Sequence, residues 1–267
     1  MSALHDAFEA ARSEGRAALI GYLPSGFPDQ AAGIELATAM VGSGVDIVEV
    51  GLPYSDPLMD GPTIQAAVHR ALLGGSTVAR VLETVSAVAA TGAPTLVMSY
   101  WNPIERIGPE PFAQRLAAAG GVGVITPDLT PEEAGPWRAA TQAHHLDRVF
   151  LVAPSSTDAR IAAVAEVTSG FVYAASTMGV TGARGSIGSR ARELVSRVRM
   201  ASTLPVAVGL GVSTGEQAAE VAGYADGVIV GSAFIQRILD APDRAAALAA
   251  VRSLAAELAE GVRRPPA

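Results

Sequence analysis

The 267-residue chain is 49% hydrophobic and 17% charged, with a formal net charge of −7 and no run of basic residues, which argues against nucleic acid as a partner. It contains no cysteine, so no disulfide holds the fold. All 19 basic residues are arginine, which excludes lysine Schiff-base mechanisms, including those of pyridoxal phosphate enzymes. The four histidines show no metal-site spacing, so no metal is predicted, and His144 and His145 are interpreted as helix surface.

The two ends of the chain carry few signals. The N-terminus has acidic residues early and no continuous apolar stretch, unlike a signal peptide. No segment reaches the roughly 18–20 apolar residues of a membrane span, so we expect a cytoplasmic protein. Residues 1–15 are expected to form an N-terminal helix, and residues 260–267 a frayed tail.

Eight short runs rich in Val, Ile and Leu recur along the chain. They lie at 17–22, 45–50, 95–100, 122–126, 148–153, 170–175, 205–209 and 227–231. Each is too short for a helix and too uniformly apolar for a sheet with one solvent-exposed face. Such runs are typical of parallel strands that are buried on both faces. Eight such strands alternating with helices predict an α/β fold, a single-domain (β/α)8 TIM barrel over residues 1–267. An open doubly wound sheet is the alternative.

Helical signals and two long loops separate these runs. Residues 78–88 carry an apolar stripe at helical spacing, and capping-box spacings at 130–133 and 213–216 predict two helix starts. Extended loops follow strands 2 and 6, at 53–62 and 176–190. In a barrel both lie at the C-terminal face, where active sites are built, and the glycine-rich second loop is interpreted as a mobile lid.

Glycine-rich turns end the seventh and eighth strands, in VGLGVS at 208–213 and VGSAF at 230–234. There backbone N–H groups can approach a ligand closely, and Ser213 and Ser232 can start helices whose N-termini favour phosphate. A tight turn without a ligand would explain either motif alone. Two motifs in consecutive places match the usual phosphate seat of a barrel, which favours phosphate binding through backbone amides.

Glu49 lies inside the second apolar run, between Val48 and Val50. Side-chain alternation places it on the face of Ile47 and Gly51, which points into the mouth of a barrel. A salt bridge to an arginine would explain a buried acid by structure alone. A desolvated carboxyl has a raised pKa, which suits proton transfer near neutral pH, so we favour a catalytic role.

The other polar candidates are ambiguous from chemistry alone. Asp56 and Asp60 can be turn residues or helix caps as readily as ligands. Tyr22, Tyr100 and Tyr173 each lie at the end of a strand and either form an aromatic wall for a flat ligand or close the core.

Four stretches together resemble the tryptophan synthase α-subunit family. They are EVGLPYSDPLMDGPTIQ at 49–65, YAASTMGVTGARG at 173–185, PVAVGLGVS at 205–213 and ADGVIVGSAF at 225–234. The resemblance runs from about residue 15 to residue 255, and its first string is highly specific. It implies a lyase of tryptophan biosynthesis that splits indole-3-glycerol phosphate into indole and glyceraldehyde 3-phosphate by retro-aldol cleavage. The indole ring itself, once protonated at C3, is the electron sink, in keeping with a chain free of lysine.

The resemblance also implies roles for individual residues. Glu49 is the acid and base that protonates C3 and removes the glyceryl hydroxyl proton, and Asp60 binds the indole N–H and stabilises the developing positive charge. The substrate-binding residues implied are Tyr22, Tyr100, Tyr173, Thr181 and Leu210, and the phosphate-binding residues are Gly182, Gly211, Gly231 and Ser232. Thr181 and Gly182 belong to the closing loop, which helps to hold Asp60.

A partner follows from the same resemblance. The family works with a β subunit that holds pyridoxal phosphate and condenses indole with serine in an α2β2 heterotetramer, whereas no cofactor is expected in this chain. Asp56 and the loop of Asp128 would face that subunit. Met59 and Thr130 depart from the family pattern, which commonly has a small residue and a proline there.

Two other functions are alternatives. A stand-alone phosphate-binding barrel enzyme, either an indole-forming lyase or a phosphosugar isomerase, fits the glycine turns equally well but does not explain the acidic string. A barrel retained only to activate a partner would not need Glu49 and Asp60.

Overall fold

The computed structural model describes residues 2–176, 184–209 and 211–263. Its strands are β1 Ala18–Pro24, β2 Ile47–Gly51, β3 Thr95–Met98, β4 Gly123–Ile125, β5 Asp147–Val149, β6 Leu151–Val152, β7 Val172–Ala175, β8 Val206–Gly209 and β9 Gly227–Val230. Its helices are α1 Ala3–Ser13, α2 Gln30–Val41, α3 Pro62–Leu73, α4 Val78–Ala89, α5 Trp101–Ile107, α6 Pro109–Ala118, α7 Gly135–Ala143, α8 Asp158–Val167, α9 Arg184–Ala201, α10 Gly215–Ala222, α11 Ser232–Leu239 and α12 Arg244–Gly261.

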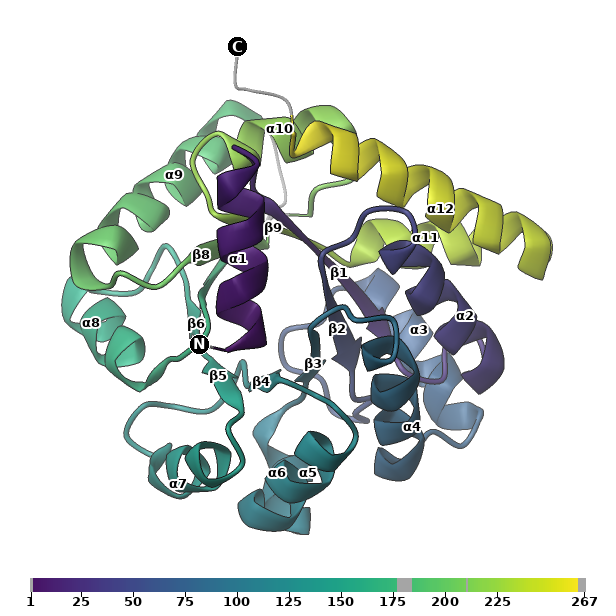
Figure 1. Cartoon of the computed structure of the whole chain (residues 1–267), viewed down its shortest axis with the longest axis horizontal. Coiled ribbons are helices and arrows are strands. Elements are labelled where there is room, and N and C mark those ends of the chain that lie inside the picture. The colour runs from purple at the N-terminus through teal and green to yellow at the C-terminus, as the bar shows by residue number, and fades with distance from the viewer. Residues whose placement is uncertain (1, 177–183, 210, 264–267) are drawn as a thin grey trace.

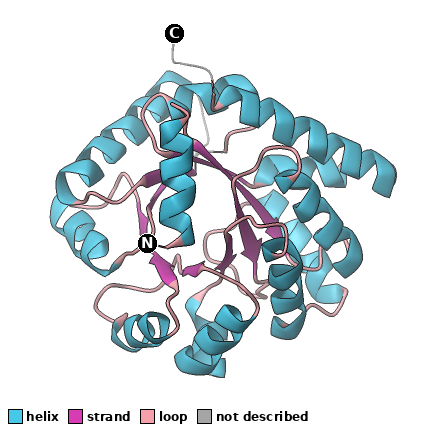
Figure 2. Ribbon diagram, in the orientation of Figure 1, coloured by secondary structure: helices cyan, strands magenta, loops and turns pink. Residues whose placement is uncertain are grey.

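The strands form one parallel sheet that curls into a ring, with helices around its outside (Figures 1 and 2). The strand order is β5-β4-β3-β2-β1-β9-β8-β7-β6. Its two end strands, β5 and β6, are separated in the chain only by Phe150, so they are two halves of one extended segment that closes the ring. With β5 and β6 counted as one strand, the nine described strands make up the eight strands of a barrel. The predicted (β/α)8 barrel is confirmed, and all eight apolar runs are strands.

Two apolar layers fill the molecule, because side chains alternate across each strand. The interior layer consists of Ala18, Ile20, Ile47, Leu96, Ile125, Val149, Phe171, Ala207 and Ile229. The predicted N-terminal helix is confirmed as α1, which closes the N-terminal end of the barrel with Leu4 and Phe8. The outer layer, which includes Val48 and Val50, packs against the surrounding helices. Burial on both faces explains why the strand sequences are continuously apolar.

Helix starts follow the sequence signals with two corrections. Thr77 caps α4 at the predicted stripe. The start predicted at 130–133 is wrong: Thr130 and Glu133 share a side-chain hydrogen bond within a turn, and α7 begins only at Gly135. The second box is shifted by one residue, because Thr214 caps α10 and accepts from Gln217 N at 3.3 Å.

Two segments differ from the sequence prediction in extent. The loop after the sixth barrel strand was expected at 176–190, but α9 begins at Arg184, so 184–190 is helical, and 177–183 lies outside the described residues. The C-terminal tail was expected to fray from residue 260, but α12 continues to Gly261 and Val262 is only 1% exposed. Val262 packs in the hydrophobic core, a contact that the local sequence does not show, and residues 264–267 lie outside the described residues.

No single helix in the described ranges is long and apolar enough to cross a membrane. The two helices α3 and α4 meet that criterion only when taken together, and they are bent by 111° at their break. Both fold back onto the barrel, where α3 contacts β1 and α4 contacts β2 and β3.

Candidate active site

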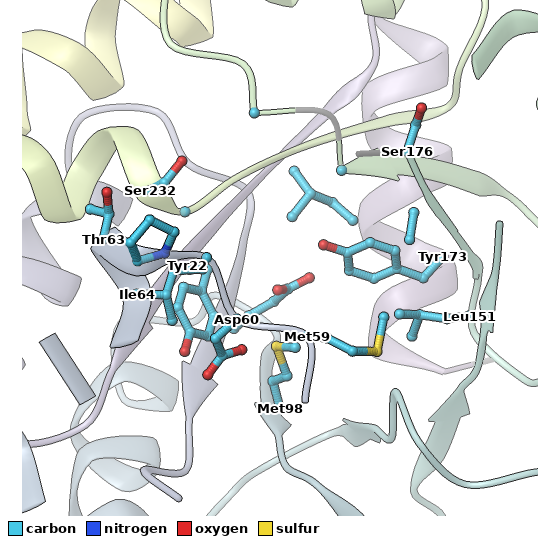
Figure 3. A pocket seen from close by; sticks show the side chains of 18 residues that line it. Tyr22, Met59, Asp60, Thr63, Ile64, Met98, Leu151, Tyr173, Ser176 and Ser232 are labelled. Carbon is cyan, nitrogen blue, oxygen red and sulfur yellow. The ribbon is translucent and has the colours of Figure 1, made fainter. Parts of the chain in front are cut away.

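A pocket of about 450 Å³ opens at the C-terminal ends of the strands (Figure 3). Its size lies within the range typical of small-molecule sites. It brings together these predicted residues: Tyr22, Glu49, Asp60, Tyr173, Gly211, Gly231 and Ser232. Thr181, Gly182 and Leu210 lie outside the described residues. The loops that follow β2 and the last two strands thus converge on one cavity, as the barrel prediction required.

Glu49 points into this pocket from the body of β2. It is paired in the strand register with Tyr22 on β1 and Leu96 on β3, and it is only 1% exposed. Burial raises its pKa from 4.5 to about 8, because the charged carboxylate is less well solvated inside the protein than in water. Its Oε1 is buried and has no hydrogen-bond partner among the described residues. Glu49 is therefore protonated at neutral pH and free to exchange that proton with a ligand.

Asp46, the other acid of this strand region, shows what a structural carboxylate looks like here. Arg16 Nη1 lies 2.7 Å from Asp46 Oδ2, and Leu19 N donates to the same oxygen at 2.7 Å. In the described part of the chain, no such ion pair is formed by Glu49. The salt-bridge explanation for a buried acid therefore applies to Asp46 and not to Glu49.

Asp60 reaches the pocket from the loop between β2 and α3. The Tyr100 hydroxyl donates to Asp60 Oδ1 at 3.1 Å and accepts from Met59 N at 2.9 Å. Burial raises the pKa of Asp60, and the hydrogen bond from Tyr100 opposes part of that rise. Gln65 Nε2 donates to the Asp60 carbonyl at 2.7 Å and ties the loop to α3. Tyr100 thus lies behind Asp60, where it lines a smaller adjoining cavity and not the main pocket.

Tyr22 and Tyr173 lie on either side of the pocket, with their rings directed into it (Figure 3). Each ring leans over a glycine of the neighbouring strand, since a Cβ at Gly209 would lie 2.5 Å from the Tyr173 hydroxyl and one at Gly51 would collide with that of Tyr22. Burial, with the charge of Glu49 as a second cause, raises the pKa of Tyr173. Both phenols therefore remain protonated at neutral pH.

Several lining residues were missed by the sequence analysis. Met98, Leu151 and Ile229 provide apolar surface, and Thr63 and Ile64 come from the first turn of α3. Strand alternation could have found the first three, because each lies on the inward face of its strand. The contribution of α3 depends on the path of the preceding loop, which the local sequence does not define.

The far end of the pocket is built from backbone. Gly211, Gly231 and Ser232 lie there, and α11 begins at Ser232 with Gly231 as an N-cap that supplies no side-chain acceptor. The N–H groups of the first turn are thus left for a ligand, and the positive end of the helix dipole favours an anion. Gly211 has φ of +72°, in the left-handed region that favours glycine. The described lining of this pocket includes no arginine.

The two predicted partner residues lie outside this pocket. Asp56 is exposed and accepts from Ser55 Oγ at 2.5 Å. Asp128 is half-buried, and its two carboxylate oxygens accept from Trp101 N at 2.9 and 3.1 Å, which caps α5.

The sequence predicts helix surface for His144 and His145, but they lie in the turn after α7, which ends at Ala143. Nε2 of His144 lies 2.6 Å from Oε1 of Glu110. Within the described ranges, no three His, Cys, Asp or Glu side chains come together as a metal site. The acids in the described lining of the pocket are Glu49 and Asp60.

Fold and site together define a class of protein, a (β/α)8-barrel enzyme whose pocket holds a buried carboxylic acid and the start of a helix. The family model of the tryptophan synthase alpha chain matches residues 8–263. The tryptophan synthase alpha chain of Thermobifida fusca is 59% identical over 266 residues, covering 98% of each chain. That of Streptomyces coelicolor is 60% identical over 261 residues, covering 97% of this chain and 96% of its own.

Solved structures agree with these relatives. A chain of the tryptophan synthase structure from Mycobacterium tuberculosis is 55% identical, with a TM-score of 0.92 over 98% of this chain and 99% of that chain. This chain therefore belongs to the tryptophan synthase alpha chain family. It is the lyase of the α reaction in tryptophan synthesis.

Proposed function

We propose that the chain cleaves indole-3-glycerol phosphate to indole and glyceraldehyde 3-phosphate with Glu49 and Asp60 as its catalytic residues. The observation that carries this proposal is the buried carboxyl of Glu49, whose Oε1 has no hydrogen-bond partner among the described residues, in a pocket that also holds Asp60. The indole ring lies in the apolar part, near Met98, Leu151 and Tyr173, and the phosphate lies at the start of α11.

Glu49 performs the proton transfers. With a pKa of about 8, it holds a proton at neutral pH and donates that proton to C3 of the indole ring. The ring becomes an iminium ion, which withdraws electrons from the bond between C3 and the side chain. The Glu49 carboxylate then removes the proton of the hydroxyl on the adjacent carbon. The aldehyde forms, the C3–carbon bond breaks, and its electron pair restores neutral indole, so that Glu49 ends protonated as it began.

Asp60 stabilises the charge that develops on the ring. Its carboxylate accepts the ring N–H, and the attraction strengthens as the ring becomes cationic. The Tyr100 hydroxyl fixes one carboxylate oxygen, which leaves the other for the substrate. Tyr22 and Tyr173 border the ring on two sides. By the family resemblance, Thr181 and Leu210 bind the substrate and Gly182 binds the phosphate, and all three lie outside the described residues.

The scheme places the second half of tryptophan synthesis on another chain. A β subunit holding pyridoxal phosphate receives the indole in an α2β2 assembly in the cytoplasm, and this chain needs no cofactor of its own. Asp56, which is exposed, and the loop of Asp128 are its contact points. Leu58 and Met59 are 78% and 53% exposed beside Asp56, which supports a protein contact on this face.

Indole release tests this proposal. Purified chain is mixed with indole-3-glycerol phosphate, and indole and glyceraldehyde 3-phosphate are quantified in parallel. Equal amounts of the two products are expected. A phosphosugar isomerase or a barrel that only activates a partner would release no indole, and that result would refute the proposal.

A further inference from the structure

A second, much smaller cavity lies behind Asp60. Its volume of about 10 Å³ is close to the roughly 10–15 Å³ that one buried water molecule requires. Its lining consists of Tyr22, Leu52, Asp60, Met98, Ser99 and Tyr100. Three of these residues, Tyr22, Asp60 and Met98, also line the main pocket, so the small cavity adjoins the substrate site.

The polar groups of this cavity have unequal hydrogen-bond capacity. The Tyr100 hydroxyl already donates to Asp60 and accepts from Met59 N, and Ser99 Oγ donates to the Tyr100 carbonyl at 2.8 Å. The second carboxylate oxygen of Asp60 and the Tyr22 hydroxyl take part in no hydrogen bond to another described residue. A buried water needs two to four polar partners, and these two groups with Tyr100 supply them.

The Tyr22 hydroxyl is held in place by the barrel. Tyr22 is 6% exposed, and its ring packs over Gly51 of β2 and Gly231 at the end of β9. In Figure 3 the hydroxyl end of Tyr22 and the carboxylate of Asp60 lie on the same side of the pocket. Burial, then the charges of Asp60 and Glu49, keep the pKa of Tyr22 well above its ordinary value. The group is therefore a permanent donor facing a carboxylate.

We propose that Tyr22 is a positioning residue for Asp60, whose carboxylate it holds through one water molecule bound in the small cavity. Tyr100 fixes Asp60 directly, and Tyr22 fixes it a second time through the water. An ordered bridging water is nearly as favourable in enthalpy as a direct hydrogen bond. This inference rests on the proposed function, because it assumes that Asp60 binds the indole N–H.

The water bridge would keep the Asp60 carboxylate in one orientation. A carboxylate stabilises a transition state best when it is oriented before the reaction begins. Removing the Tyr22 hydroxyl leaves the ring in place and loosens Asp60. The variant Tyr22→Phe should therefore reduce kcat more than it raises KM, by about fivefold or more in kcat, as expected for losing a bridged bond to a charged group.

Ligand binding separates this role from simple contact with the substrate. The probes are a non-cleavable indol-3-ylpropyl phosphate and its benzofuran counterpart, in which oxygen replaces the ring N–H. Calorimetry on the parent chain should show a preference for the indole compound, because only its N–H can bind Asp60. In Tyr22→Phe that preference should shrink while the benzofuran affinity stays within about twofold.

Tyr173→Phe is the matched control, since it removes a phenol hydroxyl from the same pocket at a site that does not line the small cavity. It should leave the ratio of the two affinities unchanged. An unchanged ratio in Tyr22→Phe would overturn the positioning role. A parent chain that binds both compounds equally would instead refute the role of Asp60 in the proposed function.

Kinetics and crystallography give independent tests. A double-mutant cycle compares the effect of Tyr22→Phe in two backgrounds. This substitution should lower kcat/KM of the parent by about fivefold or more, but lower kcat/KM of the Asp60→Asn variant by less than about twofold, because Tyr22 acts through Asp60. Equal factors in both backgrounds would overturn the proposal. A high-resolution crystal structure should show a water bonded to Tyr22 Oη and Asp60, lost in Tyr22→Phe. A direct bond between these residues would overturn the water bridge.

Discussion

Tyr100 donates its hydroxyl hydrogen to Asp60 Oδ1 over 3.1 Å, although the two residues are 40 positions apart. The bond joins the end of β3 to the loop after β2, and Met59 N donates to the same hydroxyl at 2.9 Å. A single phenol therefore fixes both the backbone and the carboxylate of the acidic loop. The loop is ordered by a neighbouring barrel strand, which lets a surface segment present a carboxylate at a defined place.

Loss of this bond should weaken catalysis without unfolding the barrel. Asp60→Asn removes the charge, and we expect a severe fall in kcat, about 100-fold or more, as for other groups that stabilise developing charge. Tyr100→Phe keeps Asp60 but frees it, so about a tenfold fall is expected, the size of one hydrogen bond to a charged group. Steady-state indole release measures both. Unchanged kinetics in Asp60→Asn would reduce Asp60 to a residue of the turn.

Glu49→Gln should abolish nearly all cleavage. The amide has almost the same shape but can neither donate a proton to C3 nor take one from the hydroxyl, and general acid–base catalysis is worth about 10²–10⁴ in rate. Binding of the non-cleavable indole phosphate, measured by calorimetry, should stay close to that of the parent. A variant with substantial activity would contradict the central assignment.

The raised pKa of Glu49 also makes stability depend on pH. Between about pH 4.5 and pH 8 the unfolded chain has released the Glu49 proton and the folded chain still holds it. The folded state binds more protons, so its stability falls as pH rises through this window, by up to about 1.4 kcal/mol per unit. Below about pH 4.5 Glu49 is protonated in both states and does not change the free energy of unfolding. Above about pH 8 it is ionised in both states, and the loss of stability no longer changes with pH.

The comparison with Glu49→Gln isolates this dependence, since glutamine does not titrate. In urea unfolding at several pH values, the free energy of unfolding of the variant should rise relative to that of the parent as pH increases from 5 to 8. If the difference between the two free energies of unfolding stayed flat across that range, Glu49 would have an ordinary pKa in the folded chain.

Gly209→Ala should damage the pocket through Tyr173. The new methyl group would lie 2.5 Å from the Tyr173 hydroxyl, so the ring must move. Gly135→Ala is a matched control, because a Cβ there meets nothing within 4 Å and its φ is not positive. We expect KM to rise several-fold in the first variant only, a change of about 1 kcal/mol. Equal KM values would show that the ring has room to shift.

The partner contact is best tested at Asp56. Asp56→Ala removes an exposed side chain, so we expect the isolated chain to keep its stability while affinity for the β subunit falls. Asp128→Ala should instead lower stability by about 1 kcal/mol, because Asp128 caps α5. Thermal unfolding and calorimetric titration with the β subunit separate the two. The α reaction should also accelerate when the β subunit is added, and a constant rate would count against that partner.

Local sequence predicted most of the scaffold. The eight apolar runs are strands because a segment buried on both faces must be apolar throughout, whatever its neighbours are. The orientation of Glu49 followed from Ile47, since alternation along a strand is a property of the backbone alone. The glycine turns at Gly211 and Gly231 also lie where the barrel prediction placed them. The roles of these residues remain predictions.

Contacts between distant segments were decided by the tertiary structure alone. The sequence does not show that Tyr100 bonds Asp60, that Asp128 caps α5, or that Thr63 lines the pocket, because each depends on ring closure and on the path of a loop. The missed start of α7 has the same cause, since the capping-box pair at 130–133 is satisfied in a turn. The sequence determined which segments are buried, and packing determined which polar groups meet.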